Sequence, residues 1–139
     1  MAGSNGWAFW ACSEFCGVTP DGQIKAADRS KQEHWRVDAG GQVALSTPRN
    51  GWASLRVVAE GAGEFAVRAE VDEPLAVELY REFYHKMAGE EPLYLADALV
   101  PVDSGATLAV PNADDPAGDQ KVQSLWVDLF IPSDAKAGV

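Results

Sequence analysis

The sequence predicts an all-β protein, an antiparallel two-sheet β-sandwich of the jelly-roll type. The first observation is the alternation of apolar and polar side chains in most segments, which is the period of a half-buried strand. The second is the supply of turn residues, because 13 glycines and eight prolines are spread along 139 residues, as many short connections require. Short strands separated by turns are typical of an antiparallel sandwich and not of an α/β fold.

We expect nine strands in chain order. They cover residues 7–15, 34–38, 42–46, 52–59, 64–71, 76–85, 93–102, 107–110 and 122–131. The first is rich in aromatic residues, and a turn follows it at residues 18–22, where Pro20 and the Asp21-Gly22 pair occupy positions that β-turns favour. Residues 25–33 are polar and predict a loop or one exposed helical turn.

The clearest hairpin joins residues 52–59 to residues 64–71. Gly61 and Gly63 lie in the connection, and the second segment alternates apolar and polar side chains along its length. Such alternation on both sides of a short glycine-containing turn predicts two neighbouring antiparallel strands.

Residues 74–87 fit two interpretations. Apolar side chains recur every four residues, at Leu75, Leu79, Phe83 and Met87, which favours a helix that begins at Pro74. The same residues also alternate as a strand would, with Leu79 and Phe83 opposite tyrosines and glutamates. Periodicity alone slightly favours the helix, and the resemblance described below favours the strand.

Composition bounds the class of protein. Hydrophobic residues make up 47% of the chain and charged residues 23%, which suits one soluble domain over residues 7–139. Residues 1–6 lack the pattern of a signal peptide and are interpreted as a leader or tag. No apolar run approaches the roughly 20 residues of a membrane span. A formal net charge of -10 argues against binding to nucleic acid or to an anionic membrane surface.

The two cysteines, Cys12 and Cys16, are interpreted as free thiols that are buried or half-buried. In an extended strand they would lie about 13 Å apart, which is too far for a disulfide, so a bridge would need a turn between them. A zinc site would need His34 and His85, whose positions show no spacing typical of zinc ligands.

The segment from Gln123 to Val139, with Leu-Trp-Val-Asp and then Pro-Ser-Asp-Ala-Lys-Ala-Gly, resembles the end of a known domain. It is similar to the N-terminal β-sandwich domain of large secreted bacterial proteins of the glycoside hydrolase family 123-like group. Residues 7–15, 77–85 and 94–102 are similar to earlier strands of those domains. The resemblance implies that residues 76–85 are extended.

The family resemblance implies a non-catalytic accessory module. In that family the catalytic carboxylates belong to a downstream barrel domain, so no catalytic residue is assigned here. The resemblance also implies an extracellular or periplasmic location, with the barrel of the same parent protein or a carbohydrate as partner. Neither histidine lies in a context typical of a nucleophilic site, and 21 acidic residues favour no particular carboxylate pair.

Two features depart from the family pattern, Cys16 in place of a polar residue and the end of the chain at Val139. The family would continue with one more strand, so the sandwich is expected to lack its last strand. An incomplete sheet exposes unpaired backbone groups. The alternative function is therefore a structural subunit that forms homo-oligomers by strand addition.

Carbohydrate ligands stack on exposed aromatic rings, and the five tryptophans supply candidates. Trp7, Trp10 and Trp126 lie in apolar strands and are expected in the core. Trp35 and Trp52 flank polar or glycine-rich turns and are the better candidates for ligand binding. Tyr84 and Tyr94 rank after them, and a core position is the alternative for each of the four.

No cofactor is expected except a structural calcium ion in the loop at residues 111–119. Four side chains of this loop offer the oxygen ligands that calcium prefers, although their spacing does not match an EF-hand. The alternative is a solvated turn. The four residues are Asn112, Asp114, Asp115 and Asp119.

Overall fold

The computed structural model describes residues 6–25, 35–89, 93–117 and 119–138. Within these ranges the chain forms two antiparallel sheets and no helix, which confirms the predicted β-sandwich class. The strands are β1 (Ala8–Ser13), β2 (Arg36–Asp38), β3 (Gly51–Glu60), β4 (Gly63–Ala66), β5 (Ala76–Met87), β6 (Leu93–Pro101), β7 (Thr107–Val110) and β8 (Val122–Ile131).

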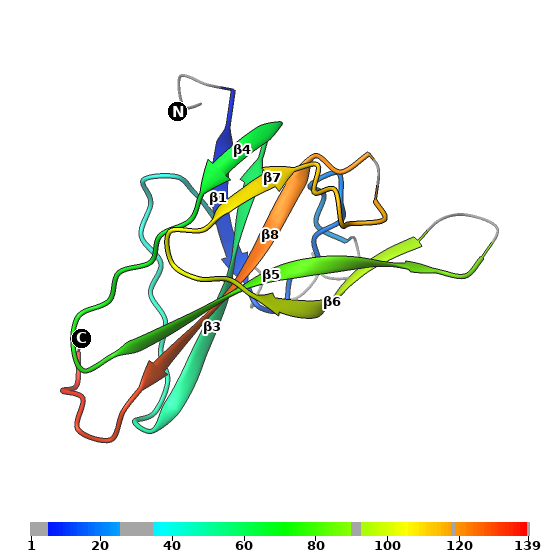
Figure 1. The fold of residues 1–139 in the computed structure, drawn as a ribbon. Helices are drawn as coiled ribbons and strands as arrows, with labels where there is room; N and C mark the ends of the chain where they lie inside the picture. Colours follow the sequence, from blue (N-terminus) through cyan, green and yellow to red (C-terminus); the bar gives the residue numbers. More distant parts are fainter. Residues whose placement is uncertain (1–5, 26–34, 90–92, 118, 139) are drawn as a thin grey trace.

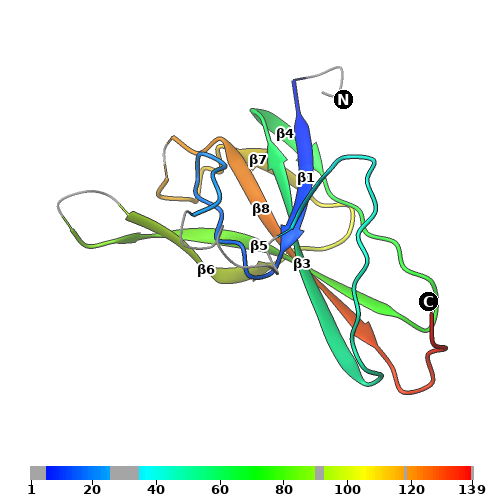
Figure 2. The same ribbon diagram turned by 180° about the vertical axis from the view of Figure 1, so that it is seen from behind.

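The two sheets are unequal in size. Six strands form the large sheet in the order β2-β1-β3-β8-β5-β6, and β4 pairs with β7 in the small sheet. The small sheet lies near one end of β1, whereas the β5–β6 hairpin projects away from the other strands (Figures 1 and 2). Aromatic contacts join the two sheets. The ring centroid of Phe65, on β4, lies 5.2 Å from that of Trp7 and 6.4 Å from that of Phe9. A jelly roll is not confirmed.

The main core lies on the other face of the large sheet. The segment after β1 turns back over this face and is held by a β-bridge between Val18 and Ile24. A fully buried tyrosine, Tyr84, donates its hydroxyl hydrogen bond to the carbonyls of Val18 and Thr19, both at 3.3 Å. The buried core cluster, with Ile24 packed against it, is Trp10, Cys12, Cys16, Val18, Val58 and Val122.

Residues 76–87 form strand β5, so the strand interpretation is confirmed and the helix interpretation is wrong. β5 pairs with β8 through residues 76–81 and with β6 through residues 80–87. Each residue of the strand has a ladder partner on at least one side, and Tyr80 and Arg81 have one on both sides. The period of four in the sequence is therefore overridden by pairing with distant strands.

The predicted hairpin between residues 52–59 and 64–71 is wrong. β3 pairs with β1 and β8, whereas β4 pairs with β7 in the other sheet. The connection carries the chain from one sheet to the other, and the conformation of this connection requires glycine at positions 61 and 63. Gly63 has a φ of 108°, which glycine adopts without strain. At Gly61, a β-carbon would lie 2.5 Å from the Trp7 ring.

The predicted strand at residues 42–46 is also wrong, because these residues join no ladder. Val43 and Leu45 instead line a hollow of about 490 Å³ together with Ala53, Leu129 and Ile131. Their apolar side chains are thus partly covered by packing across the sheet and not by strand pairing. Most of the polar segment 25–33, and His34, lie outside the described residues.

We predict that Gly61→Ala lowers the free energy of unfolding by about 1–3 kcal/mol, the usual range for overpacking. The added methyl group would displace the Trp7 ring and weaken its contact with Phe65. Urea denaturation measures the effect. Ala62→Ser, at the exposed neighbouring position, is the control and should change stability little. Equal stability of the two variants would contradict this account of the layer crossing.

Candidate functional site

Among the described residues, one half of the large sheet consists of three strands. β1 pairs with β3 only between Leu55 and Glu60, and β6 pairs with β5 only from Tyr80 onward. The remaining parts of β3, β8 and β5 form a three-stranded extension, seen in the lower half of Figure 1. Alternate residues of these strands share the face that continues from the main core.

Four aromatic side chains lie on this face in two pairs. Trp52 of β3 is the register partner of Phe130 of β8, and their ring centroids are 5.0 Å apart. Trp126 of β8 is the register partner of Tyr80 of β5. Trp52 is 50% exposed, and the other three side chains are half-buried. All four residues are therefore partly accessible to solvent.

A row of polar side chains separates the two pairs. Asp128 of β8 lies between its register partners Ser54 and Glu78. The Ser54 hydroxyl donates a 2.5 Å hydrogen bond to Asp128 Oδ1, and the Tyr80 hydroxyl donates a 2.6 Å hydrogen bond to Glu78 Oε2. The bond to Glu78 raises the pKa of Tyr80. We call the seven residues the aromatic platform: Trp52, Ser54, Glu78, Tyr80, Trp126, Asp128 and Phe130.

The Trp126 indole is held by two neighbours. Its Nε1 donates a 2.6 Å hydrogen bond to Asp128 Oδ1. The Arg56 guanidinium lies over the ring, with Cζ 5.0 Å from the ring centroid, in the range of a cation–π contact. A ring fixed in this way loses little conformational entropy when a ligand binds.

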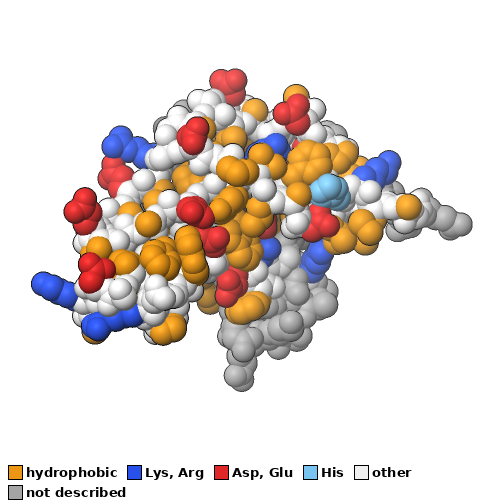
Figure 3. Space-filling view, turned by 60° about the horizontal axis from the view of Figure 1, so that its bottom comes forward, with side chains coloured by type: hydrophobic (Ala, Val, Ile, Leu, Met, Phe, Trp, Pro, Cys, Tyr) orange, Lys and Arg blue, Asp and Glu red, His pale blue; other side chains and the backbone are white. Residues whose placement is uncertain are grey.

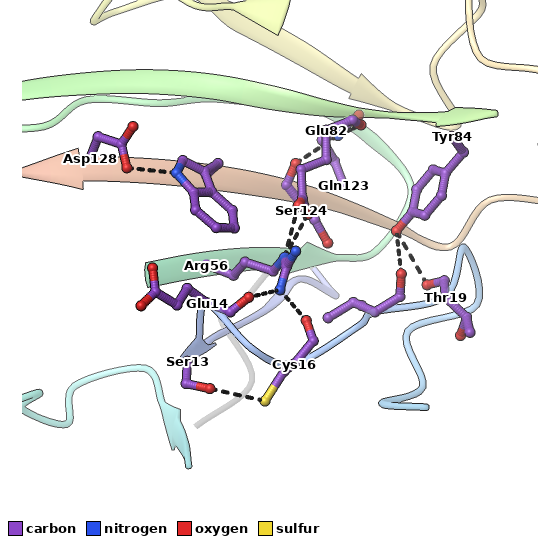
Figure 4. A network of polar contacts seen from close by, with 12 residues as sticks. Ser13, Glu14, Cys16, Thr19, Arg56, Glu82, Tyr84, Gln123, Ser124 and Asp128 are labelled. Atoms are coloured by element: carbon purple, nitrogen blue, oxygen red, sulfur yellow. Dashed lines mark hydrogen bonds and ion pairs between the residues drawn. The ribbon is translucent and has the colours of Figure 1, made fainter. Parts of the chain in front are cut away.

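Arg56 connects the platform to the core (Figure 4). It reaches from β3 to β5, where Nε donates to the Glu82 carboxylate oxygens at 2.8 and 3.0 Å. Its Nη1 donates to the Glu14 carbonyl at 2.6 Å and to the Cys16 carbonyl. The Glu82 side chain is 1% exposed and that of Arg56 12%. Burial raises the pKa of Glu82, and the charge of Arg56 opposes this shift.

The two cysteines are free and fully buried, as predicted. A turn follows β1, with the Cys16 amide donating to the Ser13 carbonyl at 3.1 Å. Burial, reinforced by the neighbouring Cys16, raises the pKa of the Cys12 thiol from 9.0 to about 12. Nucleophilic and metal-binding cysteines act as thiolates, so Cys12 is unsuited to both roles.

The structure does not bring the four predicted aromatic candidates together. Trp52 belongs to the platform, but Trp35 precedes β2, two strands away in the sheet. Tyr94 lies at the start of β6 and donates a 3.4 Å hydrogen bond to the Pro116 carbonyl. Tyr84 is fully buried and offers no ring face to a ligand. Its prediction as a ligand-binding residue is therefore wrong.

In the predicted calcium loop, the side-chain oxygens of Asn112 and Asp115 accept hydrogen bonds from backbone amides. The buried Asp115 carboxylate accepts hydrogen bonds from the amides of Tyr84 and Ala117, at 3.1 and 3.2 Å. Asn112 Oδ1 accepts the Asp114 amide at 3.0 Å, and Asp119 is exposed. In the described part of the chain, no group of three or more His, Cys, Asp or Glu side chains is arranged to hold a metal ion.

Sequence reasoning missed three platform aromatics, Tyr80, Trp126 and Phe130. Trp126 was expected in the core because its strand is apolar. A signal was present, because Trp126, Asp128 and Phe130 alternate on one face of β8 in the same way as Trp52 and Ser54 on β3. The signal becomes specific only when the register of the three strands is known.

Comparison of the sequence with protein-family models gave no match, and a search of curated proteins gave no significant match. The chemistry of the site therefore rests on its geometry. The side of the molecule seen in Figure 3 carries a band of apolar side chains with acidic side chains set among them. The platform offers ring faces for stacking and carboxylate oxygens for hydrogen bonds.

We predict that Arg56→Ala lowers the free energy of unfolding at neutral pH by about 3–5 kcal/mol, because it leaves the buried Glu82 charge without a partner. The loss should shrink at acidic pH. Without Arg56 the pKa of Glu82, already raised by burial, rises further, so the folded state takes up a proton more readily than the unfolded state as pH falls.

Urea denaturation at several pH values measures both effects. Arg68→Ala is the matched control, because Arg68 pairs with Glu70 and both side chains are about three-quarters exposed, at 76% and 74%. Such a pair is worth less than about 1 kcal/mol. A loss for Arg56→Ala that stays constant with pH would contradict the pairing with a charged Glu82.

Proposed function

We propose that this domain is a non-catalytic accessory module that binds carbohydrate on the aromatic platform. One observation carries the proposal. Two pairs of solvent-accessible aromatic side chains flank a row of hydroxyl and carboxylate groups on one face of a three-stranded sheet. The sequence resemblance to a glycoside-hydrolase-associated domain supports the same function. It suggests an extracellular or periplasmic setting beside a catalytic barrel.

The physical basis is the mixed character of sugars. A pyranose ring has an apolar face of C–H groups, which stacks on an aromatic ring, and an edge of hydroxyl groups, which needs hydrogen-bond partners. Binding sites for small molecules combine apolar walls with a few placed polar groups in the same way. Trp52 supplies the most exposed ring, and Glu78 supplies an exposed carboxylate.

The absence of catalysis is part of the proposal. Asp128 and Glu78 are cross-strand neighbours, but Asp128 Oδ1 already accepts hydrogen bonds from Ser54 and Trp126. These donors favour a role in fixing the platform. Glu78 lines a hollow with Tyr80 and Pro101, and Asp128 is not among the residues that line it, whereas glycoside hydrolysis requires two carboxyl groups flanking the scissile bond.

We predict that Trp52→Ala reduces carbohydrate binding about tenfold or more, because a stacking contact of about 1.4 kcal/mol corresponds to a factor of ten. Affinity electrophoresis against a panel of polysaccharides identifies ligands, and calorimetry measures the loss. Leu93→Ala is the matched control. Leu93 is similarly exposed, at 54% against 50%, but lies at the tip of the β5–β6 hairpin.

Equal binding by wild type and Trp52→Ala would contradict the platform as the ligand site. Binding to no polysaccharide of the panel would contradict the proposed function itself. Aryl-glycoside hydrolysis that is abolished by Asp128→Asn or Glu78→Gln would contradict the non-catalytic assignment.

Self-association by strand addition is the second candidate, and one observation favours it. β6 is a nine-residue edge strand of the large sheet, with Leu93, Leu99 and Val100 exposed. However, the β5–β6 register shifts so that Asp97 has no ladder partner, and Asp97 lies 3.4 Å from His85. A bulge and a charge on an edge strand oppose addition of a further strand.

We therefore predict that the wild-type protein stays monomeric as its concentration is raised, and that Asp97→Val promotes dimer formation. Size-exclusion chromatography with light scattering measures both. A wild-type dimer that Leu99→Lys disrupts would favour self-association through β6 instead.

A further inference from the structure

The geometry of the platform points to a narrower class of ligand: we infer that it binds a glycan chain of several sugar residues that carries no acidic groups, laid along β8. This inference rests on the proposed function and deepens it. It follows from the spacing of the aromatic pairs and from the charges around them.

The spacing sets the length of the ligand. Trp126 and Phe130 lie four residues apart on β8, which corresponds to about 13 Å along a strand. One sugar ring cannot stack on both. Asp128 lies midway on the same face, with Ser54 and Glu78 beside it. A glycan chain that follows β8 meets an aromatic pair, a polar row and a second aromatic pair in turn.

The outer strands support this direction. Trp52 on β3 adjoins Phe130, and Tyr80 on β5 adjoins Trp126. From β8, one aromatic pair therefore extends toward β3 and the other toward β5, at opposite ends of the platform. A ligand laid across the strands would reach one pair only. A chain laid along β8, or slightly diagonal to it, reaches both.

The charges select against acidic glycans. The platform contains two carboxylates, Asp128 and Glu78, and no basic residue. The neighbouring cation, Arg56, is engaged by Glu82 and by the carbonyls of Glu14 and Cys16. The whole chain adds a formal net charge of -10. Uronate or sulfate groups therefore meet like charge, whereas the hydroxyl groups of a neutral sugar can donate to the carboxylates.

The carboxylates do not exclude cationic sugars. Their present donors are neutral groups of the protein, namely the Ser54 hydroxyl, the Trp126 indole and the Tyr80 hydroxyl. A protonated amine would meet opposite charge at this polar row, so the charges limit the ligand only by disfavouring acidic groups.

The test uses the whole chain and two series of probes. The first series consists of neutral oligosaccharides of one to six residues, prepared from the neutral polysaccharide that binds best. We expect affinity to rise about tenfold or more once the oligosaccharide spans both aromatic pairs, and then to level off. Trp52→Ala should remove most of this gain and leave only the weak binding that the Trp126–Tyr80 pair supports.

The second series compares neutral polysaccharides with polygalacturonate and with a cationic glucosamine polymer. We expect polygalacturonate to bind most weakly, and the affinity of the neutral polymers to change little with salt concentration. Glu78→Gln should reduce the discrimination against polygalacturonate. Glu70→Gln, at an exposed position outside the platform, should leave it unchanged.

The outcomes separate the two levels of proposal. If neutral polymers bind through Trp52 but single sugars bind as tightly as hexamers, or if polygalacturonate binds as tightly as the neutral polymers, the proposed function stands and the present inference is overturned. If no probe binds, or if binding is indifferent to Trp52→Ala, both are overturned.

Discussion

The arrangement of this domain depends on one buried ion pair, between Arg56 and Glu82. The pair joins β3 to β5 across β8 and so connects strands that are not neighbours in the sheet. Arg56 also binds the carbonyls of Glu14 and Cys16, which fixes the turn where the chain leaves β1. A buried charge pair is costly unless both partners remain hydrogen-bonded. Here Arg56 Nε donates to both oxygens of the Glu82 carboxylate, and Nη1 donates to two backbone carbonyls.

This pair marks the boundary between two uses of the same sheet face. On one side, the segment after β1 covers Trp10, Val58 and Val122, and the face serves as core. On the other side, β3, β8 and β5 continue with aromatic side chains that remain accessible to solvent. Arg56 contributes to both the core and the aromatic platform, since its guanidinium also packs on the Trp126 ring. Stability and the shape of the platform are therefore coupled through one side chain.

The sequence predicts the class of fold and most strand positions, because period-two alternation and turn residues are local signals. It does not predict which strands pair. Residues 52–60 and 63–66 look like a hairpin locally, yet Gly61 makes room for the Trp7 ring, and the chain changes layer there. The platform was missed for the same reason. Trp126 has the sequence environment of a core residue, and only the register with β3 and β5 reveals its neighbours.

The two buried thiols have a practical consequence. Cys12 and Cys16 are 0% exposed beneath the segment that follows β1, and the high pKa of Cys12 keeps its sulfur protonated near neutrality. A thiol-reactive reagent can attack them only after that segment lifts from the sheet. The rate of modification under native conditions therefore measures how often this segment opens. The two native cysteines can report local unfolding of the domain without an engineered probe.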